Sequence, residues 1–218
     1  MKTWAIIPAR SGSKRLKDKN ILEYKGKPLL AHSIEFAKTL SFVDEIFLST
    51  DSESYAEIGL KYGAKVPFLR SGIASQDTSM EEDVLFDIRN QLIERNLELP
   101  DLILWLRPTH PIRSRNHFEQ MYTLFQTGKY DSIAAITPAD FRIFQNNDGV
   151  LKHISDSDYF KEKSMHRSQD MPLAFNMFHG ELFPFPCEYN SRFLGDNIGT
   201  VVLPREFKLD IDYKSDLL

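Results

Sequence analysis

The amino-acid sequence predicts an α/β protein built on a mostly parallel sheet with helices on both faces. Two observations lead to this prediction. Short apolar runs alternate with longer segments of helical periodicity through the first two-thirds of the chain, which is the pattern of successive βαβ units. The polar clusters PARSGSKR, STD and RPTHPIR each follow such an apolar run directly. Because ligands of parallel sheets bind at the carboxyl ends of strands, these clusters are expected at a functional site.

The first elements are expected in a regular order. Residues 4–7 (WAII) form the first strand, and a helix follows Pro28, a residue that suits the first turn of a helix. Residues 45–48 (EIFL) form the second strand. A helix over 52–62 follows and ends at Gly63, a common residue at helix C-termini.

The same order continues through the middle of the chain. The sequence Thr78-Ser-Met-Glu81 has the spacing of a capping box and predicts the start of a helix. Residues 101–106 (DLILWL) give the strongest strand signal, and a helix with apolar residues on one face then ends at Gly128. Further short apolar runs predict strands over 132–136, 198–203 and 207–212.

The 218 residues are expected to form a single domain, 1–218, that contains an insertion over 138–185. In this insertion prolines, aromatic residues and charges are mixed without a clear period, so an irregular segment with some β-structure is expected. The insertion has no obvious partner against which to bury its aromatic residues. We therefore expect a second copy of the chain to cover it, which predicts a homodimer.

The composition excludes several classes of protein. The formal net charge of −4 argues against a general nucleic-acid-binding protein, which is basic over a whole face. No apolar run approaches the ~20 residues that cross a bilayer, and the N-terminus lacks the apolar region of a signal peptide, so a cytoplasmic protein without a membrane contact is expected. The lone Cys187 excludes an intrachain disulfide and a cysteine-based metal site.

The loop after the first strand is strongly basic. Residues 10–27 hold seven Lys or Arg and only two acidic residues, a local charge of +5. The loop has neither the two glycines of a Walker A motif nor the three of a dinucleotide fingerprint. Its Gly and Ser residues still offer backbone N–H groups beside Arg and Lys, which suits a polyphosphate. The alternative is a solvated basic surface.

Eight short motifs resemble the acylneuraminate cytidylyltransferases, which are the CMP-sialic acid synthetases and their nonulosonate relatives, and the match runs in order from residue 5 to residue 216. The motifs are Ile7-Pro-Ala-Arg-Ser-Gly-Ser-Lys-Arg15, Lys19-Asn20, Gly26-Lys-Pro28, Ser49-Thr-Asp51, Tyr62-Gly-Ala, Val66-Pro-Phe-Leu-Arg70, Pro108-Thr-His-Pro-Ile-Arg113 and Leu209-Asp-Ile-Asp212. The resemblance implies a nucleotide-diphosphosugar transferase (Rossmann-like) fold. It also implies a reaction in which CTP and an acidic sugar give the CMP-sugar and pyrophosphate.

The resemblance assigns residues to the nucleotide and to a metal ion. The residues expected at the triphosphate are Arg10, Ser13, Lys14 and Lys19, those at the cytosine are Asn20 and Arg70, and those at Mg²⁺ are Asp210 and Asp212. Arg10, Lys19 and Asp212 form the expected catalytic set. The metal assignment also has a basis in the residues themselves, because residues i and i+2 of a strand face the same side and two carboxylates suit Mg²⁺.

On the acceptor side the sequence departs from the family. Arg107 replaces the usual Gln and His110 the usual Ser, while His179-Gly180 aligns with the usual Asn-Gly. The residues expected to bind the sugar are Arg107, Thr109, His179, Arg142 and Arg167, the last two supplied by the partner subunit. A buried cation must be paired, so Arg107 predicts either an additional negative or carbonyl-rich group on the sugar or an internal acid that occupies the same space.

Other functions stay open from the sequence alone. Within nucleotidyl transfer, the alternatives are a synthetase for 3-deoxy-manno-octulosonate or for methylerythritol phosphate. A glycosyltransferase could use the Asp-x-Asp motif on a nucleotide sugar. A catalytically impaired nucleotide-binding homologue is the alternative from another class.

Overall fold

The computed structural model describes residues 1–140, 143–153 and 173–217. Its centre is a six-stranded sheet in the order β10-β6-β9-β5-β1-β4. The bounds of these strands are β1 Thr3–Pro8, β4 Glu45–Ser49, β5 Leu102–Trp105, β6 Ser132–Ala139, β9 Ala174–Pro184 and β10 Ile198–Val202. β1 pairs in parallel with β4 and β5, and β10 pairs in parallel with β6, whereas β9 runs antiparallel between β5 and β6. The predicted α/β class with a mostly parallel sheet is confirmed.

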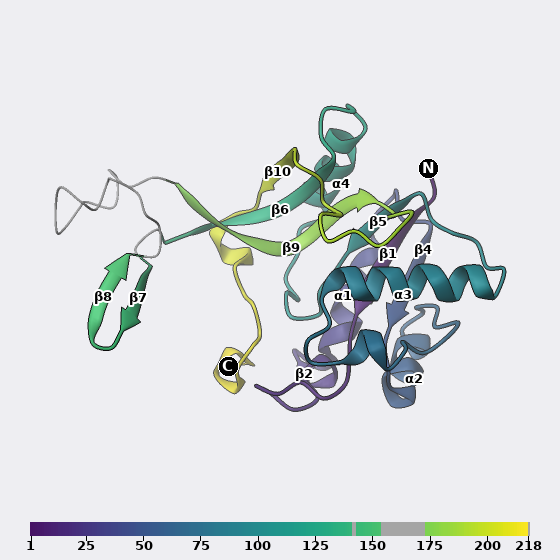
Figure 1. The fold of residues 1–218 in the computed structure, drawn as a ribbon, viewed down its shortest axis with the longest axis horizontal. Helices are drawn as coiled ribbons and strands as arrows, with labels where there is room; N and C mark the ends of the chain where they lie inside the picture. Colours follow the sequence, from purple (N-terminus) through teal and green to yellow (C-terminus); the bar gives the residue numbers. More distant parts are fainter. Residues whose placement is uncertain (141–142, 154–172, 218) are drawn as a thin grey trace.

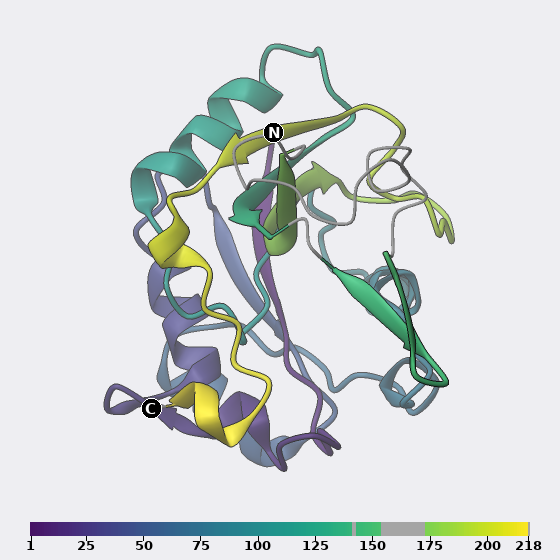
Figure 2. The same ribbon diagram turned by 90° about the vertical axis from the view of Figure 1, so that its left-hand side faces the viewer.

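Both faces of this sheet are buried, so β1 is apolar on both sides. Ala5 and Ile7 face one core, and Trp4 and Ile6 face the other. The helices are α1 Leu29–Ala37, α2 Glu53–Lys61, α3 Glu81–Glu94 and α4 Arg115–Phe125. Residues of α1, α2 and α4 pack in the first core, and those of α3 pack in the second. Figures 1 and 2 show helices on both sides of the sheet.

Short elements complete the described chain. Two small hairpins pair β2 (Glu23–Tyr24) with β3 (Lys27–Pro28), and β7 (Phe144–Asn147) with β8 (Val150–His153). The 3₁₀ turns are Lys19–Ile21, Ile73–Ser75, Arg205–Phe207 and Lys214–Leu217. The β7–β8 hairpin lies away from the central sheet (Figure 1). Among the described residues, every helix is too short or too polar to cross a bilayer.

The structure differs from the expected elements in four places. The chain over 207–212 was expected to be a strand, but beyond Phe207 it belongs to no strand and is held by a hydrogen bond from the Ile211 N–H to the Thr109 carbonyl. The expected capping box starting at Thr78 is wrong by two residues, because α3 has Met80 as its N-cap and Asp83 accepts the Met80 N–H. Pro28 lies just before α1 rather than in its first turn.

The fourth and largest difference concerns 138–185, which was expected to be irregular. Its last described part is β9, whose Leu182 and Phe183 are fully buried in the centre of the sheet. β9 thus belongs to the main body of the fold, and it connects the region of the β7–β8 hairpin to the core. Part of this insertion, 141–142 and 154–172, lies outside the described residues.

Candidate functional site

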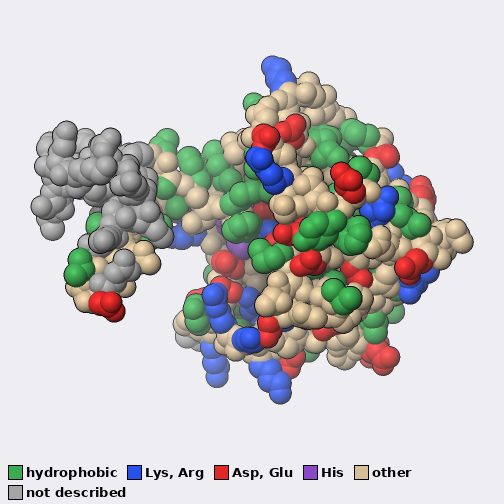
Figure 3. Space-filling model, viewed as in Figure 1, with side chains coloured by type: hydrophobic (Ala, Val, Ile, Leu, Met, Phe, Trp, Pro, Cys, Tyr) green, Lys and Arg blue, Asp and Glu red, His purple; other side chains and the backbone are tan. Residues whose placement is uncertain are grey.

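A cavity of about 550 Å³ opens at the carboxyl ends of β1 and β5. Ten of the residues predicted from the sequence line it, namely Arg10, Ser13, Lys14, Lys19, Asn20, Arg70, Arg107, Thr109, Asp210 and Asp212. Six Lys or Arg and three acidic side chains line the cavity, an excess of three positive charges. Figure 3 shows Lys and Arg side chains gathered beside a hollowed part of the surface near the opening loop. The structure therefore brings together residues that lie up to 202 positions apart, from Arg10 to Asp212.

The loop after β1 is held in shape by contacts with the neighbouring strand ends. Gly12 has a φ of +70°, a conformation that favours glycine. Asp51 accepts hydrogen bonds from the Ser11 N–H (2.7 Å) and the Ser11 hydroxyl (2.9 Å). Asn20, which is buried, donates to the Arg10 carbonyl at 3.0 Å. These bonds fix the backbone of the loop, so its Lys and Arg side chains reach the cavity from defined backbone positions.

The cations of this loop are paired with two carboxylates. Asp77 accepts from Arg10 at 2.9 Å and from Lys14 at 2.6 Å, and these two contacts lower the pKa of Asp77. Asp212 accepts from Lys19 at 2.6 Å and from Arg15 at 2.8 Å. An anionic ligand that binds these cations must therefore replace internal carboxylates. Sequence reasoning missed Asp77, because a single acidic residue in a loop has no distinguishing pattern.

Arg70 is the most buried cation at the cavity. Its guanidinium donates to the Ser49 hydroxyl (3.0 Å) and to the Ser49 carbonyl (2.8 Å). Burial lowers its pKa to about 10, which leaves it charged at neutral pH. Ser49 ends β4 and Thr50 follows it, and the Arg70 N–H donates to the Thr50 carbonyl. The STD cluster thus positions Arg70 and, through Asp51, the basic loop.

Asp210 and Asp212 lie on either side of Ile211, whose side chain is fully buried. Burial raises the pKa of Asp210, partly offset by a hydrogen bond from Thr109. In Asp212 the hydrogen bond from Lys19 lowers the pKa. Within the described residues no cluster of three or more metal-ligating side chains exists. Two carboxylates beside a cationic cavity nevertheless fit Mg²⁺, which takes one or two protein carboxylates and can fill its other positions with phosphate oxygens and water.

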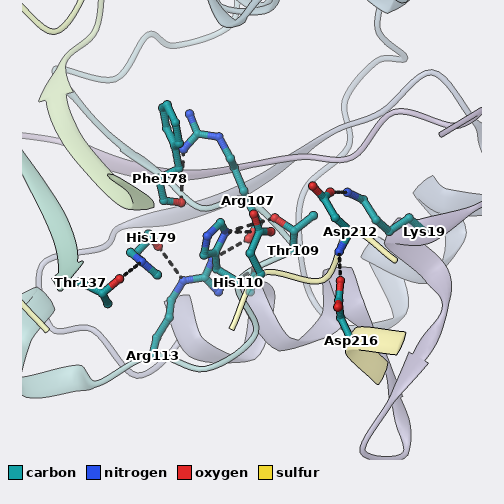
Figure 4. A network of polar contacts seen from close by, with 12 residues as sticks. Lys19, Arg107, Thr109, His110, Arg113, Thr137, Phe178, His179, Asp212 and Asp216 are labelled. Carbon is teal, nitrogen blue, oxygen red and sulfur yellow. Dashed lines mark hydrogen bonds and ion pairs between the residues drawn. The ribbon is translucent and has the colours of Figure 1, made fainter. Parts of the chain in front are cut away.

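Arg107 forms ion pairs with acidic residues of the chain itself. Of the two possibilities predicted for it, an extra negative or carbonyl-rich group on the sugar or an internal acid, the structure shows the second. Arg107 donates to Glu181 at 2.6 Å and to Glu81 at 2.9 Å, and Glu181 is only 2% exposed. Burial lowers the pKa of Arg107, but the two carboxylates outweigh this effect and raise it overall. The Phe178 ring lies over the guanidinium at 4.7 Å, as Figure 4 shows. Arg107 thus contributes no uncompensated charge to the cavity.

The two histidines form a buried pair next to the cavity. Only His110 lines it, and the rings of His110 and His179 meet edge to face at 4.6 Å. His179 bonds the Thr137 hydroxyl at 2.8 Å and lies beneath His110 rather than at the cavity wall. Burial lowers the pKa of His110 to about 2 and that of His179 to about 4, so both are neutral. Gly180 is required after His179, since a Cβ there would lie 2.6 Å from a Phe118 ring carbon.

Arg113 connects this region without lining the cavity. It donates to the Arg107 carbonyl at 2.6 Å, to the His179 carbonyl at 3.2 Å and to the Ser33 hydroxyl at 3.0 Å (Figure 4). Sequence reasoning included Arg113 in a motif but gave it no role. The other two residues predicted to bind the sugar, Arg142 and Arg167, lie outside the described residues.

Comparisons with known proteins indicate the family to which the chain belongs. The family model described as Cytidylyltransferase matches residues 4–186. A pseudaminic acid cytidylyltransferase from Campylobacter jejuni is 33% identical over 226 aligned positions, covering 100% of this chain and 94% of that protein. A CMP-N,N'-diacetyllegionaminic acid synthase from Legionella pneumophila is 37% identical over 143 positions, covering 65% of this chain and 60% of that protein.

A solved structure shares the fold. It is a CMP:2-keto-3-deoxy-manno-octonic acid synthetase complexed with CTP, which aligns with a TM-score of 0.71 over 100% of this chain and 95% of that one. At 16% identity this likeness concerns the fold alone. The family match and the similarity to the Campylobacter protein along the whole of this chain show the family as well as the fold. The chain therefore belongs to the cytidylyltransferase family, and within it to the acylneuraminate-type synthetases that the opening motif predicted.

Proposed function

We propose that this enzyme transfers the cytidylyl group of CTP to a nine-carbon acidic sugar, a nonulosonic acid, and releases pyrophosphate. The observation that carries the proposal is the cavity at the strand ends. It has an excess of three positive charges in a chain whose net charge is −4. A cationic, partly buried cavity of this kind suits a triphosphate.

The nucleotide is proposed to lie against the basic loop. Arg10, Lys14 and Lys19 would contact the phosphates, and Ser13 would donate from the loop. Binding would exchange Asp77 and Asp212 for phosphate oxygens as the partners of these cations. Asn20 and Arg70 lie deepest at this end of the cavity, and we assign the cytosine to them.

Mg²⁺ is the proposed cofactor, held by Asp210 and Asp212. When bound it would neutralise charge on the reacting phosphate and on the leaving pyrophosphate. The chain's own contribution is to hold two anionic reactants together. Lys19 and Arg10 stabilise the charge that develops as the phosphate bond breaks, and the fixed loop keeps them in place before the reaction.

The acceptor is proposed to lie near Thr109, His110 and Phe178, which line the same cavity as the basic loop. The relatives named for pseudaminic and diacetyllegionaminic acid favour a nonulosonic acid over the eight-carbon alternative. Arg107 does not require an extra negative group on the sugar, because Glu81 and Glu181 neutralise it. We further propose that Arg142 and Arg167 bind the sugar carboxylate in a homodimer, and that the reaction takes place in the cytoplasm.

The test is pyrophosphate release from CTP and Mg²⁺ with pseudaminate, N,N'-diacetyllegionaminate, N-acetylneuraminate and 2-keto-3-deoxy-manno-octonate. A nine-carbon sugar should give the highest kcat/KM. Asp212→Ala should abolish turnover, since loss of a metal ligand at the reacting phosphate costs several kcal/mol, while the melting temperature stays close to that of the wild type. Release with the eight-carbon sugar alone would contradict the acceptor class. CTP binding without any release would instead indicate a nucleotide-binding homologue.

A further inference from the structure

Phe178 has a backbone conformation that is unusual for a bulky residue. Its φ is +81°, in the region that favours glycine and is a real outlier for a large side chain. The cause is a bulge in β9. Ala135 pairs with Gly180 and Thr137 pairs with Asn176, so three residues of β9 lie opposite the single Ile136 of β6. Bulges next to active sites commonly redirect a side chain.

The bulge turns the ring out of the sheet and toward the cavity. Phe178 is 52% exposed, although the residues that follow it in β9, 179–183, are buried, and it lines the cavity. Burial of the ring in the core therefore does not compensate for its backbone strain. Strain that persists without such a gain is typical of functional positions.

The Phe178 ring also packs against Arg107 on one face. Its face lies 4.7 Å from the Arg107 guanidinium, and the Phe178 carbonyl accepts weakly from Arg107 at 3.5 Å. Glu81 and Glu181 fix that guanidinium from two further directions. Arg107 is thus a fixed support for the ring, held by two carboxylates, and Figure 4 shows Phe178 beside Arg107.

From these observations we infer that Phe178 is an acceptor-positioning residue, whose exposed ring packs against an apolar part of the sugar, such as an acyl methyl group. This inference rests on the proposed function. A rigid aromatic surface binds an apolar group with little loss of side-chain freedom. It explains why this chain keeps a large residue at a position where glycine would be unstrained.

The chain offers a matched control. Phe175 lies in the same strand and is 41% exposed, but it does not line the cavity. In steady-state assays with CTP and each of pseudaminate and N,N'-diacetyllegionaminate, Phe178→Ala should raise the KM for the sugar about tenfold, as expected for one apolar contact. The KM for CTP should stay unchanged, and Phe175→Ala should leave both constants unchanged. Phe178→Tyr, which keeps the ring, should retain the wild-type KM.

A second variant tests the strain. Phe178→Gly should melt at a higher temperature than Phe178→Ala, because glycine accepts the positive φ, and it should still show the raised KM for the sugar. Unchanged KM values in both variants would overturn the inference. A change in the mass of the assembly by light scattering, in parallel with the KM, would also overturn it and make Phe178 an interface residue. If the wild type releases no pyrophosphate with any sugar, the proposed function fails and this inference fails with it.

Discussion

Replacing Arg107 with Gln, the residue usual in the family, should destabilise this protein rather than restore a familiar site. The variant leaves Glu181 without its closest cation, and Glu181 is only 2% exposed. Removing one partner of a buried ion pair costs about 3–5 kcal/mol. At about 2–4 °C per kcal/mol for a chain of this size, a loss near 3 kcal/mol lowers the Tm by roughly 6–12 °C.

Two further variants, Glu181→Gln and the double variant, show whether this loss of stability comes from the pair of Arg107 and Glu181. Glu181→Gln should cost less, about 1–2 kcal/mol, because Arg107 keeps Glu81 at 2.9 Å. The double variant has two neutral amides in place of the pair and should recover most of the loss. The resulting coupling free energy should be about 2 kcal/mol, within the range for contacting residues.

The assay is urea unfolding followed by circular dichroism at pH 7.5, on the wild type, both single variants and the double variant. The m-values should agree, so that differences in midpoint report stability. Additive effects, with the double variant less stable than either single variant, would refute the reasoning. In that case Arg107 and Glu181 would not be paired in solution, and Arg107 could again be a ligand for an acidic group on the sugar.

Three further results are expected. Lys19→Ala should lower kcat and raise the KM for CTP. Lys17 is an exposed neighbour that does not line the cavity, so Lys17→Ala should leave both constants near the wild-type values. Equal effects of the two variants would mean that only the general surface charge matters. Asp77→Asn should tighten CTP binding about two- to fivefold by calorimetry, because the phosphates no longer compete with an exposed, weakly held carboxylate for Arg10 and Lys14. Weaker binding would mean that Asp77 organises the loop instead. The pKa of His179 is lowered to about 4 by burial, below its unfolded value of about 6.5. The unfolded chain therefore takes up the proton on His179 first as the pH falls. The contribution of His179 to the free energy of unfolding is fully present above pH 6.5, and it falls by about 1.4 kcal/mol per pH unit as the pH drops toward 4. In denaturant unfolding His179→Gln should show a shallower fall, and identical slopes would contradict a buried neutral histidine.

Much of the fold could be predicted because its parallel strands are buried on both faces and therefore form apolar runs. β9 was missed for a physical reason. Its sequence AFNMFHGELFP contains His179 and Glu181, which look out of place in a buried strand. Both are buried because they meet Thr137 and Arg107, partners that lie 42 and 74 residues away. Local periodicity contains no information about such pairs.

The cavity could be predicted to a similar extent. The basic loop and the Asp-x-Asp pair were found because their charges cluster in the sequence, and the structure brings both to one cavity. The alternation over 207–212 was assigned to a strand, but it arises from a single buried residue, Ile211, between two acids. Asp77 and Phe178 gave no signal, since one depends on loop geometry and the other on a bulge.

The antiparallel position of β9 has a consequence for how the chain folds. Until residues near 184 have been made and inserted, β6 is separate from the piece β4-β1-β5, and β5 and β6 each have an open edge. β10 itself is still later in the sequence. Such late, non-local pairing slows folding and leaves two strand edges free to pair with other chains. The contact between Arg107 and Glu181 forms across this same seam, so Arg107 gains the more buried of its two carboxylate partners only at the step that closes the sheet.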